Sequence, residues 1–194
     1  IAPAKFLCDG FTSIRQRTLE LAAPLQAEDY IPQPVQFASP PKWHLAHVTW
    51  FFEEFLLKVF QPDYQVFDES FAFLFNSYYN TIGARTFRAD RGVITRPTVD
   101  EVMSYRAHVD KHMQELIETH DENKKFCAVL EIGLNHEQQH QELMVTDLKH
   151  VFSVNPLRPV YRQRPHVLAP SPGPLAWVEQ ASGVAQVGFA GSPE

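Results

Sequence analysis

The amino-acid sequence predicts an all-α fold, a four-helix bundle with a long insertion between the second and third helices. Four segments carry helix-start signals, apolar residues at helical spacing, or both. The second and third segments are separated by residues 61–97, where no hydrophobic period is sustained. Hydrophobic residues make up 44% of the 194 residues and charged residues 21%, a balance typical of a soluble globular protein with a core.

The first helix is predicted close to the amino-terminal end. Thr12 or Ser13 can accept a hydrogen bond from an unpaired backbone N–H, so either residue can cap a helix that runs to about Asp29. Residues 30–37 contain two prolines and are therefore predicted to form a loop.

The second helix is predicted from Pro40 to about Phe60. The Ser39 side chain can cap this helix, and Pro40 supplies a helical φ angle where an N–H would have no partner. Residues 61–97 are rich in Phe, Tyr, Asn, Gly and Arg, which predicts a long irregular connection. Connections of this length inside a compact domain are usually functional.

The third and fourth helices carry the clearest signals. Thr98 and Glu101 form a capping box, which predicts a helix from there to about His120. Its apolar positions at helical spacing are Val102, Val109, Met113, Leu116 and Ile117. The fourth helix, predicted from about Asn123 to Phe152, is the longest and completes a helical bundle over residues 1–155.

The composition changes after the fourth helix. Seven of the fifteen prolines lie between Pro156 and Pro193, and we predict a Pro-rich linker over residues 156–176. In residues 177–194 valines and glycines alternate over short runs, which is enough for a strand or two but not for a complete core. We expect these residues to be the start of a second, truncated domain.

Charge and hydropathy exclude some partners. The formal net charge of -6 provides no broad positive field, so no nucleic acid partner is expected. No apolar run reaches the roughly 18 to 20 residues that span a bilayer, and the first ten residues do not resemble a signal peptide. We therefore expect no membrane partner and a cytoplasmic protein.

Cys8 and Cys127 fit neither a disulfide framework nor a C-x-x-C motif and are predicted to be buried small hydrophobic residues.

The strongest chemical signal is the pair His136 and His140 in the fourth helix. Histidines four residues apart project from one helix face and can share one metal ion. At 100° per residue, both lie in the middle of an apolar stripe and are expected to point into the bundle. The stripe consists of Val129, Ile132, Leu143, Met144 and Val151. Core histidines satisfied by hydrogen bonds are the alternative, but burying two polar rings on adjacent turns without a shared ligand is costly.

A metal site needs a third protein ligand. The zinc-protease interpretation of His136–His140 is weak because no suitable histidine or glutamate follows before the linker. Upstream, the second helix offers His44 and His47. The spacing does not choose between them, because Glu54 and Lys58 continue the same line and a partly solvated face is an equal alternative.

Other histidines carry weaker signals. His108 and His112 are four residues apart but lie away from the apolar stripe of the third helix, so they are predicted to be surface residues. Asp147 and His150 share the inward face of the fourth helix, where they are expected either to support metal ligands or to form buried hydrogen bonds.

Three motifs together resemble one enzyme family. These are PPKWHLAH at residues 40–47, FLFNSYY at residues 73–79 and HEQQHQE at residues 136–142. The combination resembles the amino-terminal DinB-like domain of the ergothioneine-biosynthesis sulfoxide synthases over about residues 10–165. The resemblance implies non-haem iron(II) held by His47, His136 and His140. It also implies that Glu137 is not a protease base, and a carboxylate at the helix flank or beside a ligand is the favoured interpretation.

The resemblance implies an oxidoreductase. Three imidazoles leave open positions on iron for a thiolate and O2, and the family joins a cysteine-type thiol to hercynine, the trimethylated histidine betaine, and oxidises the sulfur. Gln139 matches a family position that contacts hercynine. The arginines of the connection, Arg85, Arg88 and Arg91, are predicted to clamp the carboxylate of the thiol substrate, with ordinary surface arginines as the equal alternative.

Family members continue into a second domain related to the formylglycine-generating enzymes. That domain supplies the proton-donor tyrosine and much of the hercynine pocket, so no catalytic residue is predicted in this chain. Residues 177–194 are expected to be its beginning, and the fragment is expected to bind metal without completing turnover. The sulfur donor, free cysteine or γ-glutamylcysteine, stays open.

Two other functions remain open. The first is a DinB-like thiol transferase, in which a similar three-histidine site holds zinc or nickel and no second domain is needed. The second is a non-enzymatic helical interaction module whose histidines are core residues. The module predicts no bound metal and no fall in melting temperature when a chelator is added.

Overall fold

The computed structural model describes residues 4–77, 86–163 and 173–188. The chain divides into two compact units, residues 1–163 and residues 164–194. The division falls within the predicted linker, although the domain boundaries themselves stay a prediction. In the second unit, residues 173–188 form neither helix nor strand, so the strand or two expected from residue 177 onward is not found up to residue 188.

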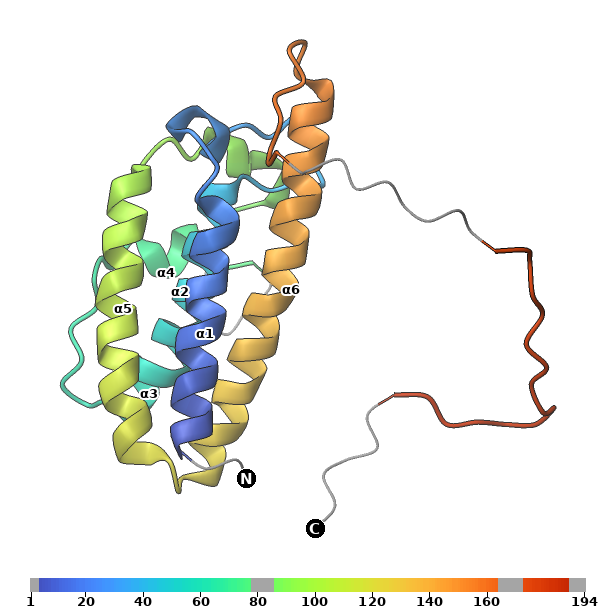
Figure 1. Cartoon of the computed structure of the whole chain (residues 1–194). Coiled ribbons are helices and arrows are strands. Elements are labelled where there is room, and N and C mark those ends of the chain that lie inside the picture. Colours follow the sequence, from blue (N-terminus) through green and yellow to red (C-terminus); the bar gives the residue numbers. More distant parts are fainter. Residues whose placement is uncertain (1–3, 78–85, 164–172, 189–194) are drawn as a thin grey trace. The chain divides into compact units, whose positions relative to one another are not determined.

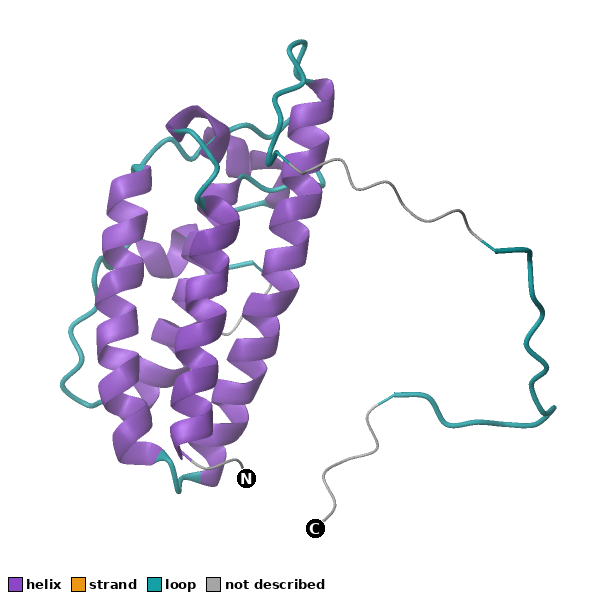
Figure 2. Ribbon diagram, viewed as in Figure 1, coloured by secondary structure: helices purple, strands orange, loops and turns teal. Residues whose placement is uncertain are grey.

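The first unit is built from helices, as the sequence predicts (Figure 2). Its α-helices are α1 (Ala4–Ala22), α2 (Pro41–Phe52), α3 (Lys58–Phe60), α4 (Phe71–Leu74), α5 (Val99–His120) and α6 (Lys124–Val154). Two short 3-10 helices, η1 (Ala27–Tyr30) and η3 (Arg88–Val93), lie in the connections. A π-helical turn, η2 (Glu53–Leu57), joins α2 to α3, so the predicted second helix is one rod with a wider turn inside it.

Four rods form the bundle. Helix α1 packs against α5 and α6, and α2 packs against the same two helices from the other side (Figure 1). Helices α1 and α2 therefore occupy opposite corners. No helix in the described part of the chain is both long and apolar enough to cross a membrane.

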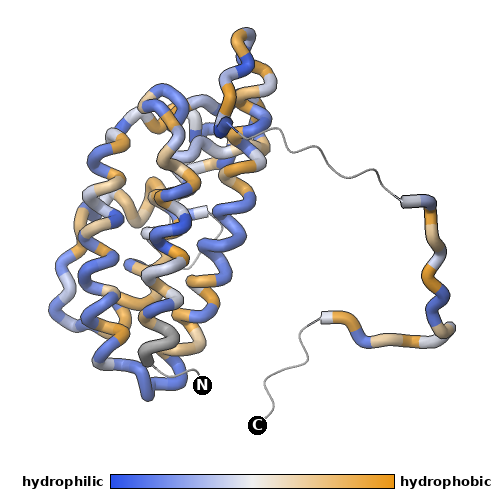
Figure 3. Tube along the Cα trace, in the orientation of Figure 1, coloured by the Kyte–Doolittle hydropathy of each residue, from blue (hydrophilic) through white to orange (hydrophobic). Residues whose placement is uncertain are grey.

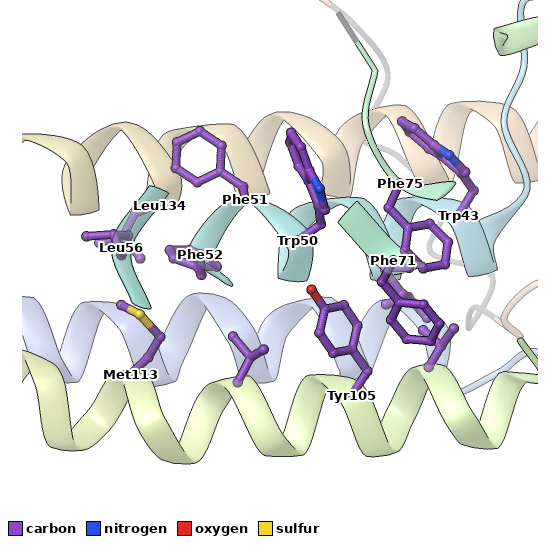
Figure 4. Packing of buried hydrophobic residues seen from close by; sticks show 14 of the residues in the cluster. Trp43, Trp50, Phe51, Phe52, Leu56, Phe71, Phe75, Tyr105, Met113 and Leu134 are labelled. Atoms are coloured by element: carbon purple, nitrogen blue, oxygen red, sulfur yellow. The ribbon is translucent and has the colours of Figure 1, made fainter. Parts of the chain in front are cut away.

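The interior is filled mainly by aromatic and aliphatic side chains of α2, η2, α4, α5 and α6. In Figure 4, Leu56 lies between Leu134 of α6 and Met113 of α5, and Trp50 lies further along the bundle, at the level of Tyr105. Every residue of α2 is buried, because the insertion covers the face that the other helices leave open. The tube coloured by hydropathy shows the alternation of polar and apolar residues along α5 and α6 (Figure 3), and all five predicted apolar positions of α5 are buried.

Of the three predicted caps, one is confirmed and two are wrong. The Thr98 hydroxyl accepts the Glu101 N–H at 3.2 Å, as predicted. The Asn123 side chain caps α6, a cap that was not predicted. Helix α1 begins at Ala4 rather than Thr12 or Ser13. It ends at Ala22 because Pro24 disfavours helical geometry in the residue before it.

At α2 the predicted role of Ser39 is also wrong. Pro40 is the cap residue, and its ring provides no side-chain hydrogen bond. The Ser39 hydroxyl instead accepts a hydrogen bond from Arg91 at 2.8 Å. A buried arginine from the insertion thus competes successfully with the helix end for this hydroxyl.

Gly133 allows α6 to approach the aromatic residues of α2 closely. A Cβ atom at this position would lie 2.7 Å from Phe52 Cε1 and 2.9 Å from Phe51 Cε1. Real Cβ atoms do not approach carbon this closely, and neither ring has free space in the core.

We predict that Gly133→Ala lowers the free energy of unfolding by about 1 to 2 kcal/mol, because overpacking outweighs the gain in helix propensity. Gly10→Ala is the matched control. Its Cβ would meet only Leu134 Cδ1 at 3.9 Å, so it should stabilise the protein by up to about 1 kcal/mol. Urea denaturation followed by circular dichroism measures both, and equal stabilisation by both variants would contradict the packing argument.

Candidate metal centre

Three predicted ligands from two helices come together in the bundle. His47 of α2 and His136 and His140 of α6 each offer a ring nitrogen, and these atoms lie within 4.8 Å of one another. The ring centroids are 5.0 Å apart for His47 and His136, 4.8 Å for His47 and His140, and 4.6 Å for the α6 pair. Since a bound metal takes histidine nitrogens at about 2.0 to 2.1 Å, small ring rotations bring all three into one coordination sphere.

The surroundings of His47 fix its ring. Its Nδ1–H donates to the Phe75 carbonyl at 2.6 Å, which leaves Nε2 with a lone pair. The ring is stacked between the indoles of Trp43, at 4.4 Å, and Trp50, at 5.4 Å. The motif at residues 73–79 therefore contributes to the site through a backbone oxygen; its Tyr78 and Tyr79 lie outside the described residues.

His44, the alternative that the sequence left open, lies beside the cluster. Its Nδ1 is 2.9 Å from Nδ1 of His140, and its Nε2 is 3.0 Å from Asp147 Oδ2. Asp147 thus makes a buried hydrogen bond to His44, and His44 contacts the candidate ligand His140. Both roles expected for Asp147, a buried hydrogen bond and support of a metal ligand, are therefore compatible with its position. His150, also predicted there, is only partly buried and packs near Phe37.

The three candidate ligands are neutral imidazoles near pH 7. Burial lowers the pKa of His136 to about 4. Burial first, and the neighbouring histidines second, also lower the pKa of His47 and of His140. Neutral imidazole is the form that binds metal.

A buried atom without a partner supports the same assignment. Nδ1 of His136 has no hydrogen-bond partner among the described residues. An orphaned buried nitrogen is costly, and a metal ion bound at this nitrogen would remove the cost. The donor set therefore fits a transition metal, and nitrogen ligands of this kind suit iron, zinc, copper and nickel.

A pocket of about 440 Å³ opens onto the three rings. Arg88, Arg91 and Gln139 line it, and no carboxylate does so among the described residues. Arg85 lies outside the described residues. Gln139 is exposed and also borders a second, more open hollow that shares His136. The only charges on the described wall are therefore positive.

The two described arginines differ in their surroundings. Arg91 is 4% exposed, donates to Ser39 and to Ser77 at 3.0 Å, and lies 3.3 Å above the Trp43 ring. Arg88 is exposed at the pocket. Their predicted role as a carboxylate clamp stays a prediction, and Arg88 has the greater freedom to meet a ligand.

Glu137 lies at the centre of the buried face of α6, so its prediction as a carboxylate at the helix flank is wrong. The other interpretation, a carboxylate beside a ligand, stays a prediction. Glu137 is 0% exposed and accepts hydrogen bonds from Arg15 at 2.9 Å, Arg106 at 3.1 Å and Thr18 at 2.6 Å. The predicted stripe was centred one residue away: Ile132 is 59% exposed. His136 and His140 therefore lie at the edge of the buried face, where they can reach a pocket.

Sequence reasoning missed Arg15 and Arg106. The sequence does hint at their burial, since Arg106 lies among the apolar positions of its helix and Arg15 follows Phe11 by one turn.

His108 and His112, predicted to be surface residues, are partly buried and their rings pack against Tyr64. Neither residue belongs to the histidine cluster.

The charge of Glu137 should stabilise the fold. Burial alone would raise the pKa of its carboxyl group, but Arg15, Arg106 and Thr18 outweigh burial and lower the pKa from 4.5 to about 2. A depressed pKa means that the unfolded chain binds the proton first as the pH falls. The stabilisation is thus complete above about pH 4.5 and is lost as the pH falls toward about 2.

We predict that Glu137→Gln lowers the free energy of unfolding near pH 7 by about 3 to 5 kcal/mol, because Arg106 loses its buried counter-ion and Arg15 keeps only the partly exposed Asp110. The difference between wild type and variant should shrink as the pH falls toward about 2. Urea denaturation of chelator-treated protein at several pH values measures this. A constant difference across the range would contradict the assignment of the charge.

Comparison with known proteins places most of the bundle in one family. The model of the DinB superfamily matches residues 11–144, which include α2, α5 and the histidine pair of α6. No curated protein matches the chain. Since the matched residues make up more than half of the chain, this protein belongs to the DinB superfamily.

Proposed function

We propose that this chain is the metal-binding domain of a non-haem iron(II) enzyme that uses O2 to join a cysteine-type thiol to hercynine as a sulfoxide, a step of ergothioneine biosynthesis. Membership of the DinB superfamily supports the domain assignment. The three motifs at residues 40–47, 73–79 and 136–142 support the particular reaction by resemblance. As a sulfoxide synthase, the full-length protein is an oxidoreductase.

The observation that carries the proposal is the pocket beside the three histidines. Neutral imidazoles of His47, His136 and His140 face a hollow whose described charged residues are Arg88 and Arg91. Positive charge, with no carboxylate among the described lining residues, favours an anionic ligand. An amino-acid thiol offers both a carboxylate and a thiolate.

Each residue has a defined task in this proposal. The histidines hold iron(II), which when bound would supply the redox chemistry of the reaction with O2. Arg88 binds the carboxylate of the thiol substrate, and Arg91 adds positive charge from its buried position. Gln139, at the rim of the pocket, contacts hercynine by hydrogen bonding. In the balanced reaction, one oxygen atom of O2 enters the sulfoxide. The other oxygen atom leaves as water, together with the hydrogen of the thiol S–H and the hydrogen of the imidazole C–H.

The remaining parts of the proposal lie outside the bundle. The proton-donor tyrosine and much of the hercynine pocket would come from a second domain, related to the formylglycine-generating enzymes, that starts within residues 177–194. The sulfur donor is cysteine or γ-glutamylcysteine, and the protein acts in the cytoplasm. Nucleic acid and membranes are not among the proposed partners.

A second candidate is a metal-dependent thiol transferase. The family match favours it because the match covers the bundle alone and the three histidines suit zinc or nickel as well as iron. The two candidates differ in their need for O2. Reaction of the full-length protein with hercynine and thiol, followed by mass spectrometry with and without O2, separates them: product formed equally in both atmospheres would reject the sulfoxide synthase.

We predict that the 194-residue chain binds one Fe(II) in an anaerobic titration. His47→Ala and His136→Ala should lose this binding, while His108→Ala should retain it. Because Trp43 and Trp50 stack on His47, quenching of their fluorescence reports the metal, and Trp177→Phe removes the indole of the second unit. Equal iron content in wild type and all variants would end the assignment; loss in His136→Ala but not in His47→Ala would point to His44.

We predict that Arg88→Ala in the full-length protein raises KM for the thiol substrate at least about 10-fold, because a charge-assisted hydrogen bond contributes about 1.5 to 3 kcal/mol. Its iron stoichiometry and melting temperature should stay unchanged, since the residue is exposed. Steady-state kinetics with an amino-acid thiol and with its decarboxylated analogue provide the check. An equal rise in KM for both thiols would show that Arg88 does not bind the carboxylate of the substrate.

A further inference from the structure

His44 connects a candidate ligand to a buried carboxylate. Its Nδ1 lies 2.9 Å from Nδ1 of His140, and its Nε2 lies 3.0 Å from Asp147 Oδ2. The same carboxylate oxygen accepts the backbone N–H of Ser39 at 2.9 Å, just before α2 begins. His44 is 3% exposed and Asp147 9% exposed, so water does not compete strongly for these hydrogen bonds.

The carboxylate of Asp147 determines which atoms donate and which accept in the hydrogen bonds that join Asp147, His44 and His140. A carboxylate only accepts, so the shared proton between His44 and Asp147 is on His44 Nε2. A neutral His44 then has no proton on Nδ1 and can only accept there. The proton between the two histidines must therefore be on Nδ1 of His140, which leaves Nε2 of His140 as the nitrogen with a lone pair.

The same arrangement is found at His47 by a different route. There a backbone carbonyl, that of Phe75, accepts the Nδ1–H and leaves Nε2 for the metal. At His140 the acceptor is a side chain that is itself held by Asp147. Histidine ligands whose second ring nitrogen donates to a fixed acceptor are better oriented and more basic.

From this geometry we propose that His44, held by Asp147, is a positioning residue that fixes the tautomer and orientation of His140 and thereby strengthens metal binding without contacting the metal. This inference rests on the metal centre of the proposed function but not on the reaction assigned to it. It also gives His44 a role distinct from that of His47, three residues further along the same helix.

The test compares two substitutions of His44. In His44→Phe the buried ring is kept but the acceptor for His140 is lost. In His44→Asn the side-chain oxygen is as many bonds from Cβ as Nδ1 is, so an acceptor is restored. The probe is Co(II), titrated anaerobically into the 194-residue chain, with affinity measured by competition against a chelator and ligand geometry by visible absorption.

We expect His44→Phe to weaken Co(II) binding by about 10- to 100-fold at unchanged stoichiometry, and His44→Asn to recover most of the loss. Asp147→Asn should weaken binding by less than His44→Phe, because His44 keeps its contact with His140. His108→Phe, which changes a partly buried histidine of α5, is the matched control and should bind as the wild type does.

Three results would overturn the inference, and they are distinguishable. Unchanged Co(II) affinity in His44→Phe, with a lower melting temperature of the metal-free protein, would make His44 a packing residue only. Loss of stoichiometric binding in both His44 variants, with altered absorption, would make it a ligand. Absence of binding in the wild type would instead reject the metal centre and the proposed function with it.

Discussion

Glu137 carries a buried negative charge that α1 and α5 hold from two sides. Arg15 and Arg106 donate to opposite oxygens of its carboxylate, and both arginines also reach the Thr49 hydroxyl of α2 at 3.0 and 3.2 Å. All four rods of the bundle therefore meet at one ionic cluster. Rotating α6 would expose or unpair this charge at a cost of about 3 to 5 kcal/mol, so Glu137 fixes the direction in which His136 and His140 point.

The candidate metal centre depends on this fixed rotation. His136 and His140 flank the buried face of α6, where they reach both α2 and the pocket. On α2, the insertion completes the surroundings of the third histidine, since Phe75 accepts its proton and Arg91 stacks on Trp43. A long connection that looks irregular in sequence thus supplies part of the wall of the site, as long connections inside compact domains often do.

Local signals were sufficient where a residue's neighbours along the chain decide the outcome. The Thr98 cap and the apolar spacing of α5 depend on contacts within a few residues and were predicted correctly. The first cap was predicted wrongly because a polar residue inside a helix resembles one at its start. Ser39 failed as a cap because Arg91, more than fifty residues away in the chain, takes its hydroxyl.

By itself the sequence determined the all-α bundle, its two longest helices and the identity of the histidine pair, because period and spacing along one helix are local properties. Only the tertiary structure decided that His47 joins this pair while His44 binds His140 and Asp147. It also decided that Glu137, and not the histidines, occupies the middle of the buried face. Helical period gives the angle at which a side chain leaves its helix, but the partner it meets depends on how separate helices pack.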